Sequence, residues 1–427
     1  MIEHHRETLP NGLRVIYAPM PRLHSANAVV CVRMGPRFET RETNGLSHFV
    51  EHMCFKGTER YPDPEAFAHA IDRIGAELNG ATEPEHTEFI ATCHHRHFLR
   101  GLELLAELVL RPRFHPDHVD IERRVVLEEL GQYHDALGVN MGDLTYELMW
   151  PRHGHHFVCL GVDDTVARFT ADDIRRHYQR HLTARNVVVC VAGNFDEATV
   201  RDVLAEQFGH LPSGEPLACP ALEHQQDAAR VLVQRGRTRR VAIRLTHKGC
   251  PYTNPRHYAL LVASEVLGGG VTSRLFTRLR EREGLVYDVS AGTTLYSDCG
   301  WVDVATTTSP RHAEAALGGV LEEIRRLADE GVSHDLLHTI KERSACQMEI
   351  LEDSPMDVAE WFAVREVLFS PETLASPTAE AERLKTTTVD DVRQMAREVF
   401  LPARRSLVFV GPSSWGLRRR LRTLAAQ

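Results

Sequence analysis

The chain has 427 residues, 43% of them hydrophobic, and a formal net charge of −9, which is the composition of a globular protein long enough for two domains. The negative charge argues against a nucleic-acid partner, and no apolar run approaches the roughly 20 residues that span a bilayer. The nine cysteines are dispersed and the first residues lack a signal-peptide pattern, so we expect a cytoplasmic protein with free thiols and no membrane partner.

Short β-branched runs alternate with longer helical patterns along the first half. The runs at 13–18 and 26–34 predict two strands that, being adjacent, would pair as a hairpin. The segment 98–110 predicts a helix. From this alternation we expect an α+β fold in which mostly antiparallel sheets pack against helices.

The first segment that carries chemistry contains His48, Glu51 and His52. Two histidines at i and i+4 lie on one helix face, so both imidazoles can reach one ion. Glu51 stands beside them and can take a proton from water that Zn²⁺ has acidified. H-x-x-E-H is the inverted zincin signature, although in a chain with 25 histidines a chance match is the alternative until a third ligand is found.

A downstream acidic helix offers that third ligand. Glu122 and Glu129 are seven residues apart, nearly two helical turns, and share one face, whereas Glu128 points elsewhere. Without the histidines, an ordinary acidic surface would be the better interpretation. With them, we assign Glu129 as the third ligand and Glu122 as an acid that orients a ligating imidazole.

The second half repeats the pattern of the first. The segment from Thr170 aligns with the segment from Thr388 at an offset of 218 residues, and each copy predicts a threonine N-cap, a helix and an apolar strand. We therefore predict two duplicated domains, residues 1–213 and 225–427, joined by a Pro/Gly-rich linker at 214–224. The same offset maps the predicted metal-site residues onto Val266, Gly269, Gly270, Ile340 and Gln347. One zinc ion per chain follows.

These segments together resemble the pitrilysin/insulinase-type zinc metallopeptidases (inverzincins), most closely the short, bacterial-type members related to the mitochondrial processing peptidase. The resemblance covers nearly the whole chain and is carried in order by LPNGLRVIYAPMP, GLSHFVEHMCFKGTERYP, GAELNGATEPEHTEF, ERRVVLEEL and SRLFTRLREREGLVYDVS. It implies zinc ligands at His48, His52 and Glu129 and a general base at Glu51, and it favours Glu129 over Glu128.

The resemblance also implies how substrate is held. An edge strand of the first domain would take up the substrate backbone by strand addition, with Asn79 and Ala81 as candidate contacts. The alternative for this stretch is a turn, because Asn-Gly is a strong turn signal.

A second implied group, Arg280 and Tyr287 from the second half, would reach the substrate and donate hydrogen bonds to the carbonyl oxygen as it gains charge. Arg278 and Arg282 lie nearby and remain alternatives to Arg280. A structural tyrosine and a surface arginine are the simpler interpretation of these residues without the resemblance.

The function implied is that of a zinc-dependent endopeptidase that hydrolyses peptides or small unfolded proteins inside a closed chamber, with removal of a leader from a precursor as a narrower version. A homodimer is expected, because one chain carries both the zinc motif and the Arg/Tyr segment; a heterodimer with a homologous subunit is the alternative. The competing function is a non-catalytic structural or assembly subunit, which the retained motif residues disfavour.

Two further histidine groups lack helical spacing with an acidic partner. They are His94, His95 and His97, and His153, His155 and His156. We expect a solvated or packing role for both groups.

Overall fold

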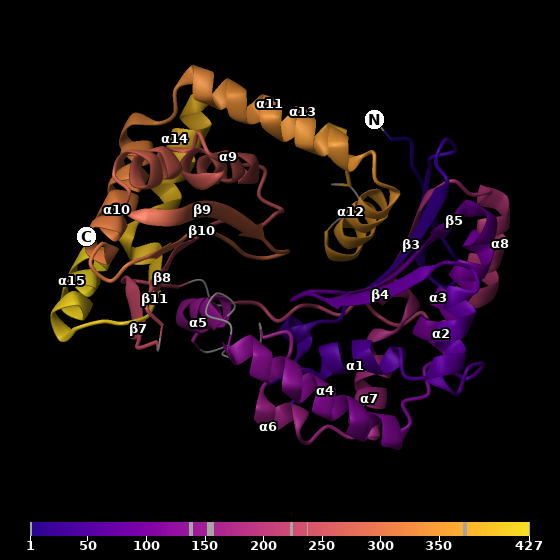
Figure 1. The fold of residues 1–427 in the computed structure, drawn as a ribbon. Coiled ribbons are helices and arrows are strands. Elements are labelled where there is room, and N and C mark those ends of the chain that lie inside the picture. The colour runs from indigo at the N-terminus through magenta and orange to yellow at the C-terminus, as the bar shows by residue number, and fades with distance from the viewer. Residues whose placement is uncertain are drawn as a thin grey trace. The chain divides into compact units, whose positions relative to one another are not determined.

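The computed structural model describes residues 2–135, 140–151, 158–222, 225–236, 238–369 and 374–426. The chain divides into two compact units (Figure 1). The first comprises Met1–Gln132, His155–Pro220 and Met348–Ala379, and the second Tyr133–Gly154, Ala221–Gln347 and Glu380–Gln427. The chain leaves the first unit for the second after Pro220, which lies inside the predicted 214–224 linker. The units differ from the two sequence halves because each also holds one segment of the other half.

The first unit is built on a six-stranded sheet of order β1-β2-β6-β3-β5-β4. Its strands are β1 (His5–Thr8), β2 (Arg14–Pro19), β3 (Ser25–Val32), β4 (Glu77–Thr82), β5 (Thr87–His94) and β6 (Val187–Gly193). Every neighbouring pair is antiparallel except β2 and β6. The predicted hairpin of 13–18 with 26–34 is wrong: β6 lies between β2 and β3, a non-local pairing that local sequence does not encode.

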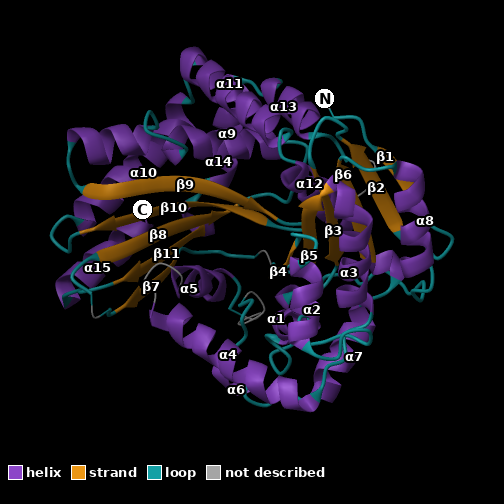
Figure 2. Cartoon of the chain, turned by 45° about the vertical axis from the view of Figure 1, so that its right-hand side comes forward, coloured by secondary structure: helices purple, strands orange, loops and turns teal. Residues whose placement is uncertain are grey.

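Helices cover both faces of this sheet (Figure 2). The helices of this unit are α1 (Leu46–Cys54), α2 (Pro64–Asp72), α3 (Phe98–Leu110), α4 (Pro116–Asp135), α6 (Asp163–Val166), α7 (Ala171–His181), α8 (Glu197–Phe208) and α12 (Pro355–Leu368), with short 3₁₀ turns η1 (Pro36–Phe38), η2 (His95–His97) and η4 (Ala184–Asn186). Alternate residues of β3 face opposite ways: Val30 joins the core shared with α1 and α3, and Val29 joins the core under α12.

Helix α12 comes from the second half of the sequence but completes the first unit. Its Phe362 is fully buried against the sheet. Its Glu366, also fully buried, accepts hydrogen bonds from Arg6 Nη2 at 2.7 Å and Arg14 Nη1 at 3.4 Å, and Arg14 Nη1 also donates to the Glu366 backbone carbonyl at 2.8 Å. Apolar burial and a buried ion pair therefore both attach α12 to β1 and β2.

The second unit has a five-stranded sheet of order β7-β11-β8-β10-β9. Its strands are β7 (Arg230–Gln234), β8 (Val241–Lys248), β9 (Val286–Leu295), β10 (Gly300–Thr308) and β11 (Arg405–Val410). The helices are α5 (Asn140–Met149), α9 (His257–Gly268), α10 (Ala313–Glu330), α11 (His334–Leu351), α13 (Pro377–Lys385), α14 (Val389–Val399) and α15 (Trp415–Ala426), with the π-helical η5 (Phe276–Arg282) and the 3₁₀ turn η7 (Pro402–Arg404). Helix α5, from the first half of the sequence, packs on β11 through Met141 and Val408.

The two sheets repeat one topology, so the predicted duplicated α+β fold is confirmed. The order β2-β6-β3-β5-β4 corresponds to β7-β11-β8-β10-β9, and in each sheet the first of these pairs is parallel. The predicted N-caps are also confirmed, because Thr170 and Thr388 each form a capping box, with Asp173 and Asp391.

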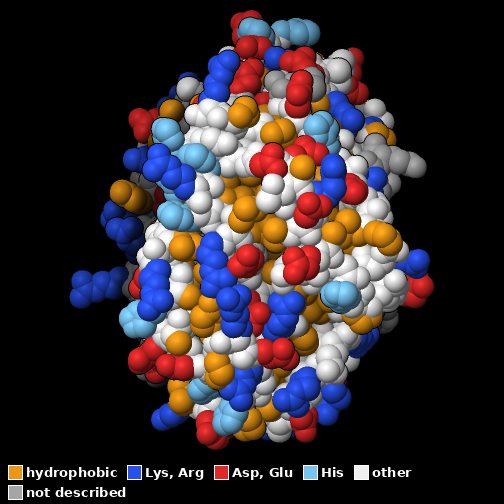
Figure 3. Space-filling view, turned by 90° about the vertical axis from the view of Figure 1, so that its right-hand side faces the viewer, with side chains coloured by type: hydrophobic (Ala, Val, Ile, Leu, Met, Phe, Trp, Pro, Cys, Tyr) orange, Lys and Arg blue, Asp and Glu red, His pale blue; other side chains and the backbone are white. Residues whose placement is uncertain are grey.

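Charged side chains of both signs are interspersed over the face shown in Figure 3. Among the described residues, no helix combines the length and apolar character needed to cross a membrane.

Candidate metal centre

Helix α1 is placed by a buried acid that precedes it. Gly45 begins the helix in a left-handed conformation, with φ of 99°, and an added Cβ there would lie 2.8 Å from the Cα of Gly161. The Glu39 carboxylate accepts hydrogen bonds from the backbone N–H groups of Gly45 and Ser47, both at 2.7 Å. Glu39 thus satisfies N-terminal amides of α1 and orients the helix. Burial raises the pKa of Glu39, against these hydrogen bonds.

The structure brings His48, His52 and Glu129 together. The two imidazole Nε2 atoms lie 3.2 Å apart, and Glu129 Oε2 is 3.6 Å from His52 Nε2 and 3.9 Å from His48 Nε2. The histidine side chains are 13% and 16% exposed and that of Glu129 is 39% exposed, so the group is not sealed from solvent. Two helices, α1 and α4, therefore deliver three converging ligand atoms.

This donor set fits a zinc ion. With Zn–N bonds of about 2.0–2.1 Å, tetrahedral ligands are about 3.3 Å apart, close to the separations here. Burial, with His52 nearby, lowers the pKa of His48 to about 3, so its ring is neutral, as a ligand must be. Its Nδ1 has no hydrogen-bond partner among the described residues. Three protein ligands and an open fourth position are the arrangement of catalytic zinc.

Glu122 lies behind the ligands, as expected for an orienting acid. It is 2% exposed, its Oε1 is 2.7 Å from His52 Nδ1, and its Oε2 is 2.8 Å from Lys56 Nζ. Burial acts to raise the pKa of Glu122, but these two partners outweigh it and lower the pKa. For His52 likewise, burial acts to lower the pKa, but the bond to Glu122 and the nearby carboxylates outweigh it and raise the pKa. A carboxylate on Nδ1 leaves Nε2 free for a metal.

Glu51 lies beside the ligands on the buried side of α1, 9% exposed. The Thr82 hydroxyl donates a hydrogen bond to Glu51 Oε2 at 2.8 Å. Burial raises the pKa of Glu51, against this hydrogen bond. Gly80 faces the same carboxylate, and a Cβ there would lie 2.9 Å from Glu51 Cγ. Strand β4 thus fixes the position of a carboxylate whose raised pKa suits proton transfer.

Asn79 and Ala81 lie within β4, so this stretch is a strand and the turn alternative is wrong. β4 ends the sheet and pairs with β5 alone among the described strands. The Asn79 side chain accepts a hydrogen bond from the backbone N–H of Gly80 at 2.9 Å. The other edge of β4 is geometrically suited to add a peptide strand.

Arg280 and Tyr287 lie together in the second unit. The Arg280 guanidinium carbon is 5.4 Å from the centre of the Tyr287 ring, within cation–π range. Tyr287 is 69% exposed. Arg278, one of the alternatives, is instead occupied by ion pairs with Glu283, Glu322 and Glu323.

The constant offset of 218 does not extend to the counterpart of the metal helix. It relates α4 to α11 and α7 to α14, but α9 ends at Gly268, so Gly269 and Gly270 lie beyond it. Fewer residues separate the strand β8 from α9 than separate β3 from α1. The counterparts of the metal-motif residues of α1 therefore lie nearer the start of α9 than the constant offset predicts. Among the described residues of the second unit, no three metal donors converge as those of α1 and α4 do.

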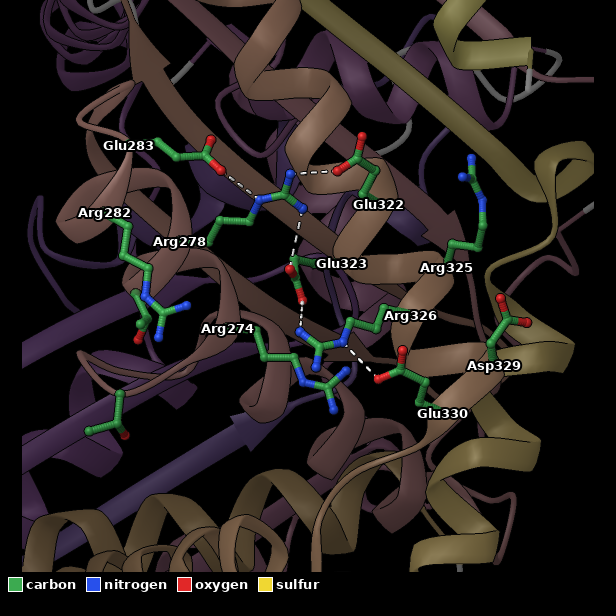
Figure 4. Close-up of a pocket in the computed structure, with 12 residues that line it drawn as sticks. Arg274, Arg278, Arg282, Glu283, Glu322, Glu323, Arg325, Arg326, Asp329 and Glu330 are labelled. Carbon is green, nitrogen blue, oxygen red and sulfur yellow. Dashed lines mark hydrogen bonds and ion pairs between the residues drawn. The ribbon is translucent and has the colours of Figure 1, made fainter.

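A pocket of about 660 Å³ in the second unit offers no competing centre (Figure 4). Five arginines and five acids line it. Arg278 in η5 pairs with Glu322 and Glu323 of α10, and Arg326 pairs with Glu330 at 2.7 Å within α10. The opposite charges offset one another, and the pairs of Arg278 link η5 to α10.

Three residues that position the site were not predicted from the sequence: Glu39, Lys56 and Thr82. Lys56 carried a weak signal, as one of four lysines in the chain and four residues after His52. Thr82 lay within the predicted edge strand without being singled out. Glu39 gave no signal, because a cap seven residues before Leu46, the first residue of α1, follows no local pattern. His153, His155 and His156 lie outside the described residues.

Comparison with known proteins places these features in a family. Residues 14–147 match the family model of insulinase (peptidase family M16), and residues 168–344 match that of the peptidase M16 inactive domain. An uncharacterized zinc protease of Streptomyces coelicolor is 32% identical, over 95% of this chain and 89% of its own length. The mitochondrial-processing peptidase subunit beta of Blastocladiella emersonii is 26% identical, over 95% and 88%.

Among solved structures, a protease from Helicobacter pylori superposes with a TM-score of 0.89 over 96% of this chain and all of its own. Its sequence identity is 23%, so it supports the fold alone.

Proposed function

The chain belongs to the M16 peptidase family, and on this premise we propose that it is a zinc-dependent endopeptidase that cuts peptides or small unfolded proteins. The observation that carries the proposal is the convergence of His48 Nε2, His52 Nε2 and Glu129 Oε2 beside the buried carboxylate of Glu51. All these residues lie within 14–147, the match to the insulinase model, and none lies in the part matched as inactive.

The residues divide the chemistry as follows. His48, His52 and Glu129 would hold one zinc ion, which when bound supplies a Lewis acid that acidifies water and polarises a carbonyl. Glu51 takes the proton of the attacking water and passes it to the leaving amine; its raised pKa brings it nearer to neutral pH for both transfers. Thr82 holds Glu51 by its hydrogen bond to Oε2.

We extend the proposal to substrate binding. The free edge of β4 accepts an extended peptide as an added strand, with Asn79 and Ala81 alongside it. Arg280 and Tyr287 donate hydrogen bonds to the substrate carbonyl oxygen as it gains charge. The chamber is completed by a second copy of the chain; sedimentation at working concentration would report the expected homodimer.

Glu51→Gln tests the proposal directly. The variant keeps its zinc, because Glu51 is not a ligand, but loses cleavage of a mixed peptide library read by mass spectrometry. Glu128→Gln is the control and retains both properties. Cleavage by Glu51→Gln at the wild-type rate would refute the base assignment. A wild-type protein without zinc and without cuts would instead favour a non-catalytic assembly subunit.

A further inference from the structure

A second group of metal donors lies in the first unit, apart from the catalytic one. It consists of His24 in the loop between β2 and β3, His94 at the end of β5, and His95 at the start of η2. One ring nitrogen from each lies within 4.8 Å of the others. In the described part of the chain, this trio and His48, His52 and Glu129 are the groups of three potential ligands that meet this spacing.

The backbone holds these three residues together. His95 N–H donates to the His24 carbonyl at 2.9 Å, and His94 pairs with Ser25 in the register of β5 with β3. Asn194 donates from Nδ2 to the Leu23 carbonyl at 2.8 Å, which fixes the loop on its other side. The convergence of the imidazoles therefore comes from the sheet and the loop, and not from bonds between the rings.

The three imidazole rings lie close together, and their nitrogens take little part in hydrogen bonds or ion pairs with the rest of the protein. The centroids of His94 and His95 are 4.6 Å apart, and those of His24 and His94 are 6.1 Å apart. No salt bridge joins these three histidines to an acid within the described residues. The Nδ1 of His94 accepts a long hydrogen bond, 3.3 Å, from Arg96 N–H, which water could replace at this exposed position.

We propose that His24, His94 and His95 form a second metal site, for a divalent transition ion of the zinc type. Imidazole nitrogens suit Zn²⁺, Cu²⁺ and Ni²⁺, and they do not suit Ca²⁺ or Mg²⁺, which take oxygen ligands. The ring nitrogens must close from within 4.8 Å to about 3.3 Å, so this site binds more weakly than the catalytic one.

The site is separate from the catalytic centre. Thr87 pairs with Thr82, the partner of Glu51, and β5 then runs seven residues to His94, about 23 Å at 3.3 Å per residue. An ion there would join the β2–β3 loop to the end of β5, and would stabilise the first unit by binding the folded form alone.

The test uses untagged full-length protein carrying Glu51→Gln, so that no self-cleavage interferes, and equilibrium dialysis against rising free Zn²⁺. Two ions per chain are expected, the second at micromolar concentration. His94→Ala and His95→Ala should each weaken binding of the second ion at least tenfold and leave binding of the first unchanged. The neighbouring His97→Ala should change neither affinity.

A second measurement separates binding from misfolding. Saturation of the second site should raise the melting temperature of the parent protein and of His97→Ala, but not that of His94→Ala. Binding of only one ion up to 100 μM zinc, or equal weakening by His97→Ala, would overturn the proposal. Since Mg²⁺ should produce neither effect, an equal shift with Mg²⁺ would overturn it as well.

Discussion

The two units place equivalent helices side by side and join them by different chemistry. In the first unit, α1 and α4 present two imidazoles and a carboxylate to a common point. In the second, α9 and α11 are joined by an ion pair between Glu265 and Arg343. The duplicated fold thus forms in both units, and the second has an ion pair where the first has converging metal donors. The proposed metal binding then depends on a few side chains that this scaffold carries.

The largest effect should come from removing the ligand on α4. Glu129→Ala leaves two protein ligands, and zinc affinity should fall by more than the roughly 100-fold that changes outside the ligand shell reach. Peptide cleavage should fall with it. Zinc content by mass spectrometry after dialysis measures the loss. Glu128→Ala, one residue away on another face, is the control, and equal loss in both variants would contradict the ligand assignment.

The next effect concerns the acid behind the ligands. Glu122→Ala removes the partner of both His52 and Lys56, so zinc affinity should fall by about 10- to 100-fold. The matched change is Glu265→Ala, which breaks the link in the other helix pair. It should leave zinc untouched and cost at most about 1 kcal/mol, because that ion pair is partly exposed. Chelator competition measures the zinc affinity of Glu122→Ala, and urea unfolding measures the stability of Glu265→Ala.

A smaller effect should follow from crowding the base. The Cβ of Gly80→Ala would meet Glu51 Cγ at 2.9 Å, so the carboxylate must move and kcat should fall about tenfold with zinc retained. Gly292 on β9, the corresponding edge strand, has open space around it, and Gly292→Ala should be neutral. A zinc-loaded Gly80→Ala enzyme with unchanged kcat would contradict the contact.

The remaining effect is on stability alone and concerns pH and a buried acid on β5. Burial, with Glu360 and Glu83 nearby, raises the pKa of Glu88 to about 8 from 4.5. Stability linked to this group is fully present below pH 4.5 and is lost as the pH rises through 8. Glu88→Gln should therefore raise the melting temperature more at pH 9 than at pH 6, by the equivalent of roughly 1–3 kcal/mol.

Asp303 on β10 offers the contrast in the second sheet. It pairs with Arg244 at 3.1 Å, so Asp303→Asn should lower stability. A gain from Glu88→Gln that did not depend on pH would refute the shifted pKa as its cause.

Local sequence patterns predicted several secondary-structure elements and site residues of this protein. The Thr170 and Thr388 caps, the strand after each and the helix at 98–110 follow from short-range chemistry. The i, i+4 histidines and the seven-residue spacing of Glu122 and Glu129 placed four side chains that the structure brings together. A helix repeat reports which residues share a face without any tertiary information.

Long-range contacts were beyond this kind of reasoning. Nothing near 13–18 indicates that β6 will pair there, some 170 residues later. His24 joins His94 through the sheet register, and Glu39 caps α1 from outside the helix. Helix α5 packs in the second unit and α12 in the first, each away from its own half of the sequence. Both depend on sheet faces that exist only once the strands have assembled.

Helix α12 also restricts how this chain can be cut. A truncation product that stops at the 214–224 linker keeps the three proposed zinc ligands but loses the cover over Ile16, Val29 and Ile90. It also leaves Arg6 and Arg14 without Glu366. A bare apolar sheet face promotes aggregation. We expect such a fragment to be insoluble until residues 348–379 are supplied in trans. The proposed catalytic segment should therefore not fold as a soluble protein on its own, because its sheet is completed by a helix encoded far downstream.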